Sequence, residues 1–168
     1  MSFGAKAKRI PGSGSVMPNP SPLLRVCQLL NDAGAKYLIA GAHACILHGL
    51  VRTTEDVDIL IESSEENCRR IIEGLAGMED RAAAELTPKD LLENVVVKVA
   101  DEVEVDVSTQ AWKVGYEEAI EGARQAVIDG VQVPFLGLDA LIASKETYRE
   151  KDAWDRERLL ELKRRRRE

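Results

Sequence analysis

Aromatic residues, cysteines and long hydrophobic runs are all scarce in this 168-residue sequence. Aromatic residues make up only 4%, so a folded core must be built from Val, Leu, Ile and Ala. No apolar run approaches the ~20 residues that span a membrane, and the N-terminus lacks a secretory signal. The three cysteines form no CxxC pair, which favours reduced thiols. We therefore expect a cytoplasmic protein with no membrane partner.

The length suits one domain, and a hydrophobic content of 45% is that of a globular protein. We expect three segments: a flexible leader rich in Gly, Ser and Pro over residues 1–20, a folded domain over 21–162, and a basic tail over 163–168. The net charge is −6, so the tail is basic on an acidic protein. Such a run is usually the solvated end of a helix, but it leaves a weak nucleic-acid contact open.

The pattern of apolar residues predicts an α+β fold, with a small mixed sheet flanked by helices. Ser21 and Pro22 begin a helix that Gly34 ends. Ser63 and Glu66 form a capping box before a second helix. Further helices are expected at 42–49, near 116–121 and from 138 onward, with a break near 148–151. Strands are expected at 36–40, 57–62, 95–100, 103–108, 126–128 and 131–133, the last two joined by the Asp129-Gly130 turn.

Asp56 and Asp58 are the first candidate site residues. They stand two positions apart at the start of the strand expected at 57–62, so both carboxylates point to the same face. Carboxylates this close repel each other unless a cation lies between them, and hard oxygen ligands favour Mg²⁺. An Asp-x-Asp pair alone is a weak signal, because calcium loops and acidic surfaces contain it as well.

The residues around this pair make the signal more specific. Gly41 ends the preceding strand, where it lets the chain approach a ligand, and the short helix after it offers free N–H groups to a triphosphate. Asp106 lies on the polar face of a later strand and adds a third carboxylate. Three carboxylates can hold two metal ions ~4 Å apart, the arrangement used for phosphoryl and nucleotidyl transfer. Arg52 and Thr53 are close enough to contact a phosphate, although an Arg52–Glu55 ion pair is nearly as favourable.

The segment from Gly41 to Leu60 resembles the signature of minimal nucleotidyltransferases of the polymerase-beta-like superfamily, including toxin-type members of abortive-infection systems. Two further blocks carry the resemblance, Val103–Val107 and the helix Leu138–Lys145 followed by Arg149, Lys151, Asp152 and Asp155. The resemblance covers roughly residues 24 to 160. It implies a nucleotidyltransferase (polymerase-beta-like) fold.

The resemblance also implies roles for individual residues. Asp56 and Asp58 would bind metal, and Asp106 would be the third ligand that also activates the acceptor. Gly41 and Ala42 would lie under the triphosphate, although a second Gly or a Ser is usual at position 42. Lys145 would contact phosphate. Without the resemblance, an equally good explanation is that the aliphatic part of its side chain packs along an apolar helix while the ammonium reaches water.

The expected function is transfer of a nucleoside monophosphate from an NTP, ATP being the expected one, to a hydroxyl on a protein, RNA or small molecule, with two Mg²⁺ ions. The alternative is a weakly active or inactive nucleotide-binding module of a two-protein, toxin-antitoxin-like system, which Ala42 motivates. The acceptor is unknown, and the sequence leaves open whether a homodimer or a partner protein provides its binding surface. We expect Trp112 and Trp154 to be packing residues rather than platforms for nucleobases.

Overall fold

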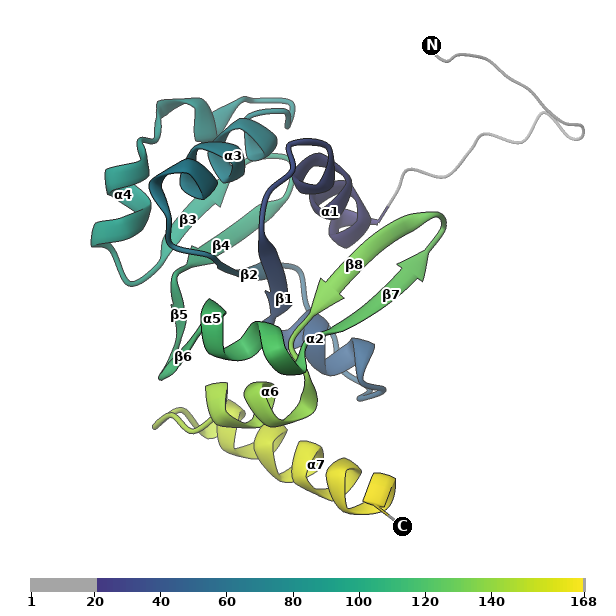
Figure 1. Ribbon diagram of the computed structural model, residues 1–168. Helices are drawn as coiled ribbons and strands as arrows, with labels where there is room; N and C mark the ends of the chain where they lie inside the picture. Colours follow the sequence, from purple (N-terminus) through teal and green to yellow (C-terminus); the bar gives the residue numbers. More distant parts are fainter. Residues whose placement is uncertain (1–20, 168) are drawn as a thin grey trace, which may run out of the picture.

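A six-stranded mixed sheet forms the centre of the computed structural model, which describes residues 21–167 (Figure 1). Its strand order is β3-β4-β2-β1-β8-β7. β1 is antiparallel to β2 and parallel to β8, whereas β2 is parallel to β4; the outer pairs β3–β4 and β7–β8 are antiparallel. The strands are β1 Tyr37–Ala40, β2 Val57–Ile61, β3 Val97–Ala100, β4 Glu104–Ser108, β7 Arg124–Ile128 and β8 Val131–Phe135. The leader expected at 1–20 lies outside the described residues.

Helices lie on both sides of this sheet. In the view of Figure 1, α1, α3 and α4 are above it, and α6 and α7 are below it. The helices are α1 Pro22–Asp32, α2 Gly41–Leu47, α3 Glu65–Leu75, α4 Pro88–Glu93, α5 Tyr116–Ala119, α6 Leu138–Ser144 and α7 Glu150–Arg167. Two 3₁₀ turns, Ala82–Glu85 and Ile120–Gly122, and a short hairpin of β5 Gln110–Ala111 and β6 Val114–Gly115 complete the described chain. The predicted α+β architecture is confirmed.

Side-chain caps account for the N-termini of α1, α3 and α4. The Ser21 hydroxyl accepts a hydrogen bond from the Leu24 N–H at 3.2 Å, and Gly34 follows α1 with a φ of +68°, so both ends of the first helix are as predicted. The capping box of Ser63 with Glu66 is wrong. Ser64 caps α3 instead, because its hydroxyl accepts from the Asn67 N–H at 3.1 Å.

The core is aliphatic, as the shortage of aromatic residues requires. All four residues of β1 and four of the five in β2 are buried, because both strands lie in the middle of the sheet and are covered on both sides. The exception in β2 is Asp58, which is partly exposed. One polar side chain therefore interrupts an otherwise apolar strand, and it belongs to the predicted site.

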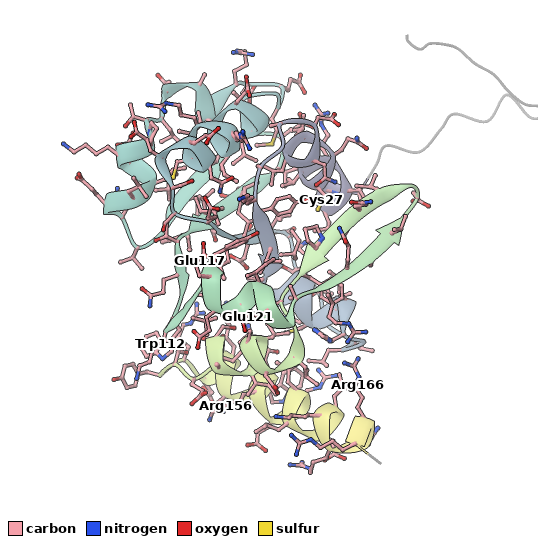
Figure 2. All side chains as sticks on the ribbon, viewed as in Figure 1. Cys27, Trp112, Glu117, Glu121, Arg156 and Arg166 are labelled. Atoms are coloured by element: carbon pink, nitrogen blue, oxygen red, sulfur yellow. The ribbon has the colours of Figure 1, made fainter. Side chains whose placement is uncertain are left out.

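The basic residues near the C-terminus form the last turns of α7. The Arg166 guanidinium donates to the His48 carbonyl at 3.0 Å and lies 3.2 Å from the His48 ring Nδ1, which attaches the helix to the end of α2 (Arg166 is labelled in Figure 2). Lys163 pairs with Asp139 at 2.7 Å, and Arg164 binds Glu161. Much of this positive charge is therefore already paired within the protein. Among residues 21–167, no helix is both long and apolar enough to cross a membrane.

Candidate active site

Two carboxylates from different strands lie side by side near the centre of the sheet. Asp58 on β2 pairs in register with Asp106 on β4, its parallel neighbour. Val57 and Val105, which precede them, are fully buried, because alternate residues of a strand face opposite sides of the sheet. Alternation predicts the direction of each carboxylate, and the pairing of β2 with β4 brings them together.

The two carboxylates repel each other, and burial makes their negative charge less favourable. Burial, and then repulsion by the Asp106 carboxylate, raises the pKa of Asp58 to about 6; the Lys145 ammonium acts in the opposite direction. Within residues 21–167, the buried Asp106 Oδ1 has no hydrogen-bond partner. A buried acceptor without a partner is costly, and a bound cation would relieve both the repulsion and the missing contact.

The side-chain ammonium of Lys98 already lies among these carboxylates, where a metal ion would bind. Lys98 faces Asp106 across the β3–β4 ladder, and its Nζ is 3.0 Å from Asp106 Oδ1 and 3.8 Å from Asp56 Oδ2. The contact with Asp106 is an ion pair without hydrogen-bond geometry. Contact with the Asp106 carboxylate raises the pKa of Lys98. The side chain is half exposed, so its ammonium can move into water when another cation arrives.

Replacing Lys98 by methionine should tighten the binding of a divalent cation. The substitution keeps the apolar stem and removes the charge that competes for Asp56 and Asp106. Calorimetric titration with Mn²⁺ would show a severalfold lower dissociation constant. Lys89→Met is the matched control, because Lys89 is exposed on α4 and contacts only Glu93 there. Weaker cation binding in Lys98→Met would mean that Lys98 supports the site rather than competes for it.

Gly41 brings the backbone directly against Asp58. It follows the last residue of β1, has a φ of +60°, and lies beside the Ala40–Asp58 pair of the β1–β2 ladder. A Cβ built on Gly41 would be 2.1 Å from Asp58 Oδ2 and 2.8 Å from Asp58 Cγ. Glycine suits this position for two reasons: a φ of +60° strains other residues, and an added side chain would displace the Asp58 carboxylate. The next residue, Ala42, is buried in the first turn of α2.

A buried ionic network lies at the junction of α6 and α7. Lys145 Nζ is 3.0 Å from Asp155 Oδ2 and 3.4 Å from Asp152 Oδ1, and all three residues are buried. Arg52 also binds Asp155, and Arg149 Nε donates to Asp152 at 2.7 Å. Arg52 therefore pairs with Asp155, not with Glu55. Sequence reasoning assigns no role to either aspartate, although their spacing of three residues on a helix places them on one face.

Most of these groups line one cavity of about 550 Å³; Lys98 and Asp155 lie outside its lining. Among the residues predicted for the site, it is lined by Gly41, Ala42, Arg52, Asp56, Asp58, Asp106 and Lys145. Thr53 is exposed and does not line the cavity, whereas its neighbour Thr54 does. Carboxylates, cations and a close backbone approach are thus gathered in a space large enough for a nucleotide-sized ligand.

The donor set fits a hard divalent cation, but the ligands are not fully assembled. Within the described part of the chain, no three His, Cys, Asp or Glu side chains stand arranged to hold a metal ion. Asp58 and Asp106 are adjacent, whereas Asp56 is engaged by Lys98. Asp106 Oδ1, which among the described residues has no hydrogen bond and faces only the half-exposed Lys98 ammonium, and the raised Asp58 pKa are the features of a carboxylate pair that a bound cation would stabilise.

Comparison with known proteins identifies the fold. No family model and no curated protein matches the sequence. Among solved structures, an antigenic nucleotidyltransferase-like protein from Paracoccidioides brasiliensis is similar with a TM-score of 0.53 and 16% identity, over 83% of this chain and 72% of that one. A putative nucleotidyltransferase from Thermotoga maritima has a TM-score of 0.47 and 14% identity, over 71% of this chain and 78% of that one. The first likeness confirms the predicted nucleotidyltransferase fold.

Proposed function

We propose that this protein is a Mg²⁺-dependent nucleotidyltransferase that moves a nucleoside monophosphate from an NTP to a hydroxyl group on a protein, RNA or small molecule. The observation that carries the proposal is the register pairing of Asp58 with Asp106, with Gly41 against it, in a cavity that is also lined by the buried Lys145 and the partly buried Arg52. Two adjacent carboxylates without a neutralising cation destabilise the folded protein. Such a pair is useful where a cation and phosphates bind.

The carboxylates would hold the metal. Asp58 and Asp106 supply adjacent oxygens, and Asp56 becomes available once Lys98 moves away. When bound, Mg²⁺ supplies positive charge that neutralises phosphate oxygens and lowers the pKa of the acceptor hydroxyl. Asp106 Oδ1 would take the proton from that hydroxyl. The hydroxyl oxygen then bonds to the α-phosphorus as the bond to pyrophosphate breaks.

The cations of the cavity would bind the triphosphate. Lys145 and Arg52 are positioned by Asp155, which touches both, so their charged groups are held in place before a ligand arrives. A preorganised guanidinium and ammonium are suited to phosphate oxygens, and little rotational freedom is lost on binding. Gly41 lets the backbone come close to the same ligand because it has no side chain.

Incubation with labelled NTPs, Mg²⁺ and cell lysate tests the proposal. The wild-type protein should label an acceptor, and Asp106→Asn should label none, because the substitution keeps the shape and removes the charge. Glu104→Gln is the matched control: Glu104 is two residues away on the same face of β4, is exposed, does not line the cavity, and reaches the site only through a 4.0 Å contact with the half-exposed Lys98. Equal labelling by wild type and Asp106→Asn, or labelling lost equally in Glu104→Gln, would contradict the proposed site.

A further inference from the structure

Two aromatic side chains from distant parts of the sequence meet beside the site. Trp112 lies in the turn of the β5–β6 hairpin, and Tyr148 lies in the segment that joins α6 to α7. Their rings pack edge to face, with centroids 5.7 Å apart and an interplanar angle of 89°. Figure 2 shows Trp112 at the free end of the hairpin, next to the α6–α7 connection. The hairpin and this connection thus touch through an aromatic pair.

Neither ring is held by the core. The Tyr148 side chain is 96% exposed and Trp112 is 41% exposed, in a protein whose Tyr37 and Phe135 are buried. The packing predicted for Trp112 and Trp154 occurs only at the surface, where Trp112 contacts Tyr148 and Trp154 lies under Arg158; Trp154 is 58% exposed as well. Trp112 also has a φ of +60°, a conformation that turns normally assign to Gly, Asn or Asp. A large aromatic residue kept in this conformation indicates a role outside folding.

Both rings line the same cavity as the carboxylates and the cations. Val95 and Val96, which are also exposed, line it too, so part of the cavity lining is apolar and aromatic. Its ionic portion contains Asp58, Asp106, Lys145 and Arg52. A ligand with a planar aromatic group and several negative charges on one molecule would match this lining when a cation neutralises the carboxylates. A nucleoside triphosphate has this chemistry.

We infer that Trp112 and Tyr148 form the nucleobase site of the donor NTP, with Val95 and Val96 as its apolar wall. The inference rests on the proposed function and adds to it the residues that bind the base. Because each nucleobase has an aromatic face, stacking on these rings favours bases in general over a particular one. The site therefore accepts more than one NTP. The two rings increase the affinity for the NTP rather than select a particular base.

Intrinsic fluorescence can report on this site directly. The sequence has two tryptophans, so Trp154→Phe leaves Trp112 as the single reporter. Trp154 is a safe residue to change, because it does not line the cavity; its ring is stacked under the Arg158 guanidinium at 4.5 Å. With Mg²⁺ present, ATP should quench the Trp112 emission. Inorganic tripolyphosphate, which has no base, should bind without quenching.

Substitution of Tyr148 separates base binding from phosphate binding. Tyr148→Ala should weaken ATP binding on the order of tenfold, as loss of one stacking partner does, and leave tripolyphosphate binding unchanged. Tyr148→Phe should restore ATP affinity, because it keeps the ring. Calorimetry on the full chain measures wild type and both variants, and the high exposure of Tyr148 means that the substitutions should leave the circular dichroism spectrum unchanged.

The outcomes distinguish this inference from the function on which it rests. If ATP and tripolyphosphate lose affinity equally in Tyr148→Ala, or if ATP affinity does not change, the base site is wrong and the transferase proposal stands. If a single-stranded RNA oligonucleotide loses affinity in Tyr148→Ala and ATP does not, the rings bind an acceptor instead, which also overturns the inference. If neither ATP nor tripolyphosphate binds the wild type, the proposed function itself fails.

Discussion

Replacing Asp58 by asparagine should abolish nucleotide transfer and make the metal-free protein more stable at neutral pH. Transfer is lost because the variant cannot provide a charged oxygen to the cation, a change that we expect to reduce the rate by at least about 10³-fold. Stability rises because a carboxylate that is buried beside Asp106 costs free energy in the native state.

The size and the pH range of the stability gain follow from the raised Asp58 pKa. The native state holds the Asp58 proton with a pKa of about 6, compared with the ordinary aspartate value of 3.8, which applies to the unfolded chain. Between these values the folded protein binds more protons than the unfolded chain, so wild-type stability falls as the pH rises from about 4 to 6. Above pH 6 the full cost, about 3 kcal/mol at most, is present. The asparagine variant avoids it.

Thermal unfolding in a chelating buffer measures this difference. At pH 7 the Tm of Asp58→Asn should exceed that of the wild type by on the order of 5 °C, and the difference should shrink towards pH 4. Added Mg²⁺ should stabilise the wild type and not the variant. Glu104→Gln is the control, since Glu104 is exposed on the neighbouring strand β4. A folded Asp58→Asn protein that is less stable than wild type at pH 7 would contradict the argument that burial beside Asp106 makes the Asp58 carboxylate unfavourable.

Gly41→Ala should destabilise the fold and displace Asp58. The new Cβ meets Asp58 Oδ2 at 2.1 Å and Cγ at 2.8 Å, and alanine disfavours a φ of +60°. We expect a loss of about 2–4 kcal/mol in the free energy of unfolding, together with loss of transfer. Denaturant titration measures the first effect, and the labelling assay measures the second.

A matched control isolates the steric part of this effect. Gly34 has a φ of +68°, and a Cβ added there would meet no atom within 4 Å, so Gly34→Ala changes only the backbone preference and should cost about 1 kcal/mol. In an Asp58→Ala background, the cost of Gly41→Ala should fall towards the same value, which a double-mutant cycle would show. If Gly41→Ala costs no more than Gly34→Ala in the wild-type background, the contact with Asp58 is not what requires glycine.

Residues whose environment is local in sequence are predictable from it. Ser21 and Gly34 limit α1 as expected, and Asp129 and Gly130 form the β7–β8 turn with positive φ values of 50° and 81°. Asp58 faces the cavity because strand alternation alone decides its direction. These features depend on a few neighbouring residues, and sequence patterns describe such neighbours directly.

Features that depend on strand order or on distant segments cannot be predicted in this way. Sequence patterns give Lys98 no role, because its contact with Asp56 requires β4 to lie between β3 and β2. The same is true of Asp155, which meets Arg52 only after α7 packs against the loop that follows α2. The β5–β6 hairpin escapes prediction because each strand has two residues and Trp112 stands where a turn residue is usual. Tertiary packing decides each of these cases.

The contact between Gly41 and Asp58 also predicts which residues can occur together at positions 41 and 58 in related sequences. Because a side chain at position 41 and a carboxylate at position 58 compete for the same space, the two should not occur together in one protein. A copy that has gained a side chain at position 41 is expected to have lost or moved the carboxylate, and with it the metal-dependent chemistry proposed above. Inspection of these two positions would then separate functional copies from degenerate ones before any biochemical experiment is made.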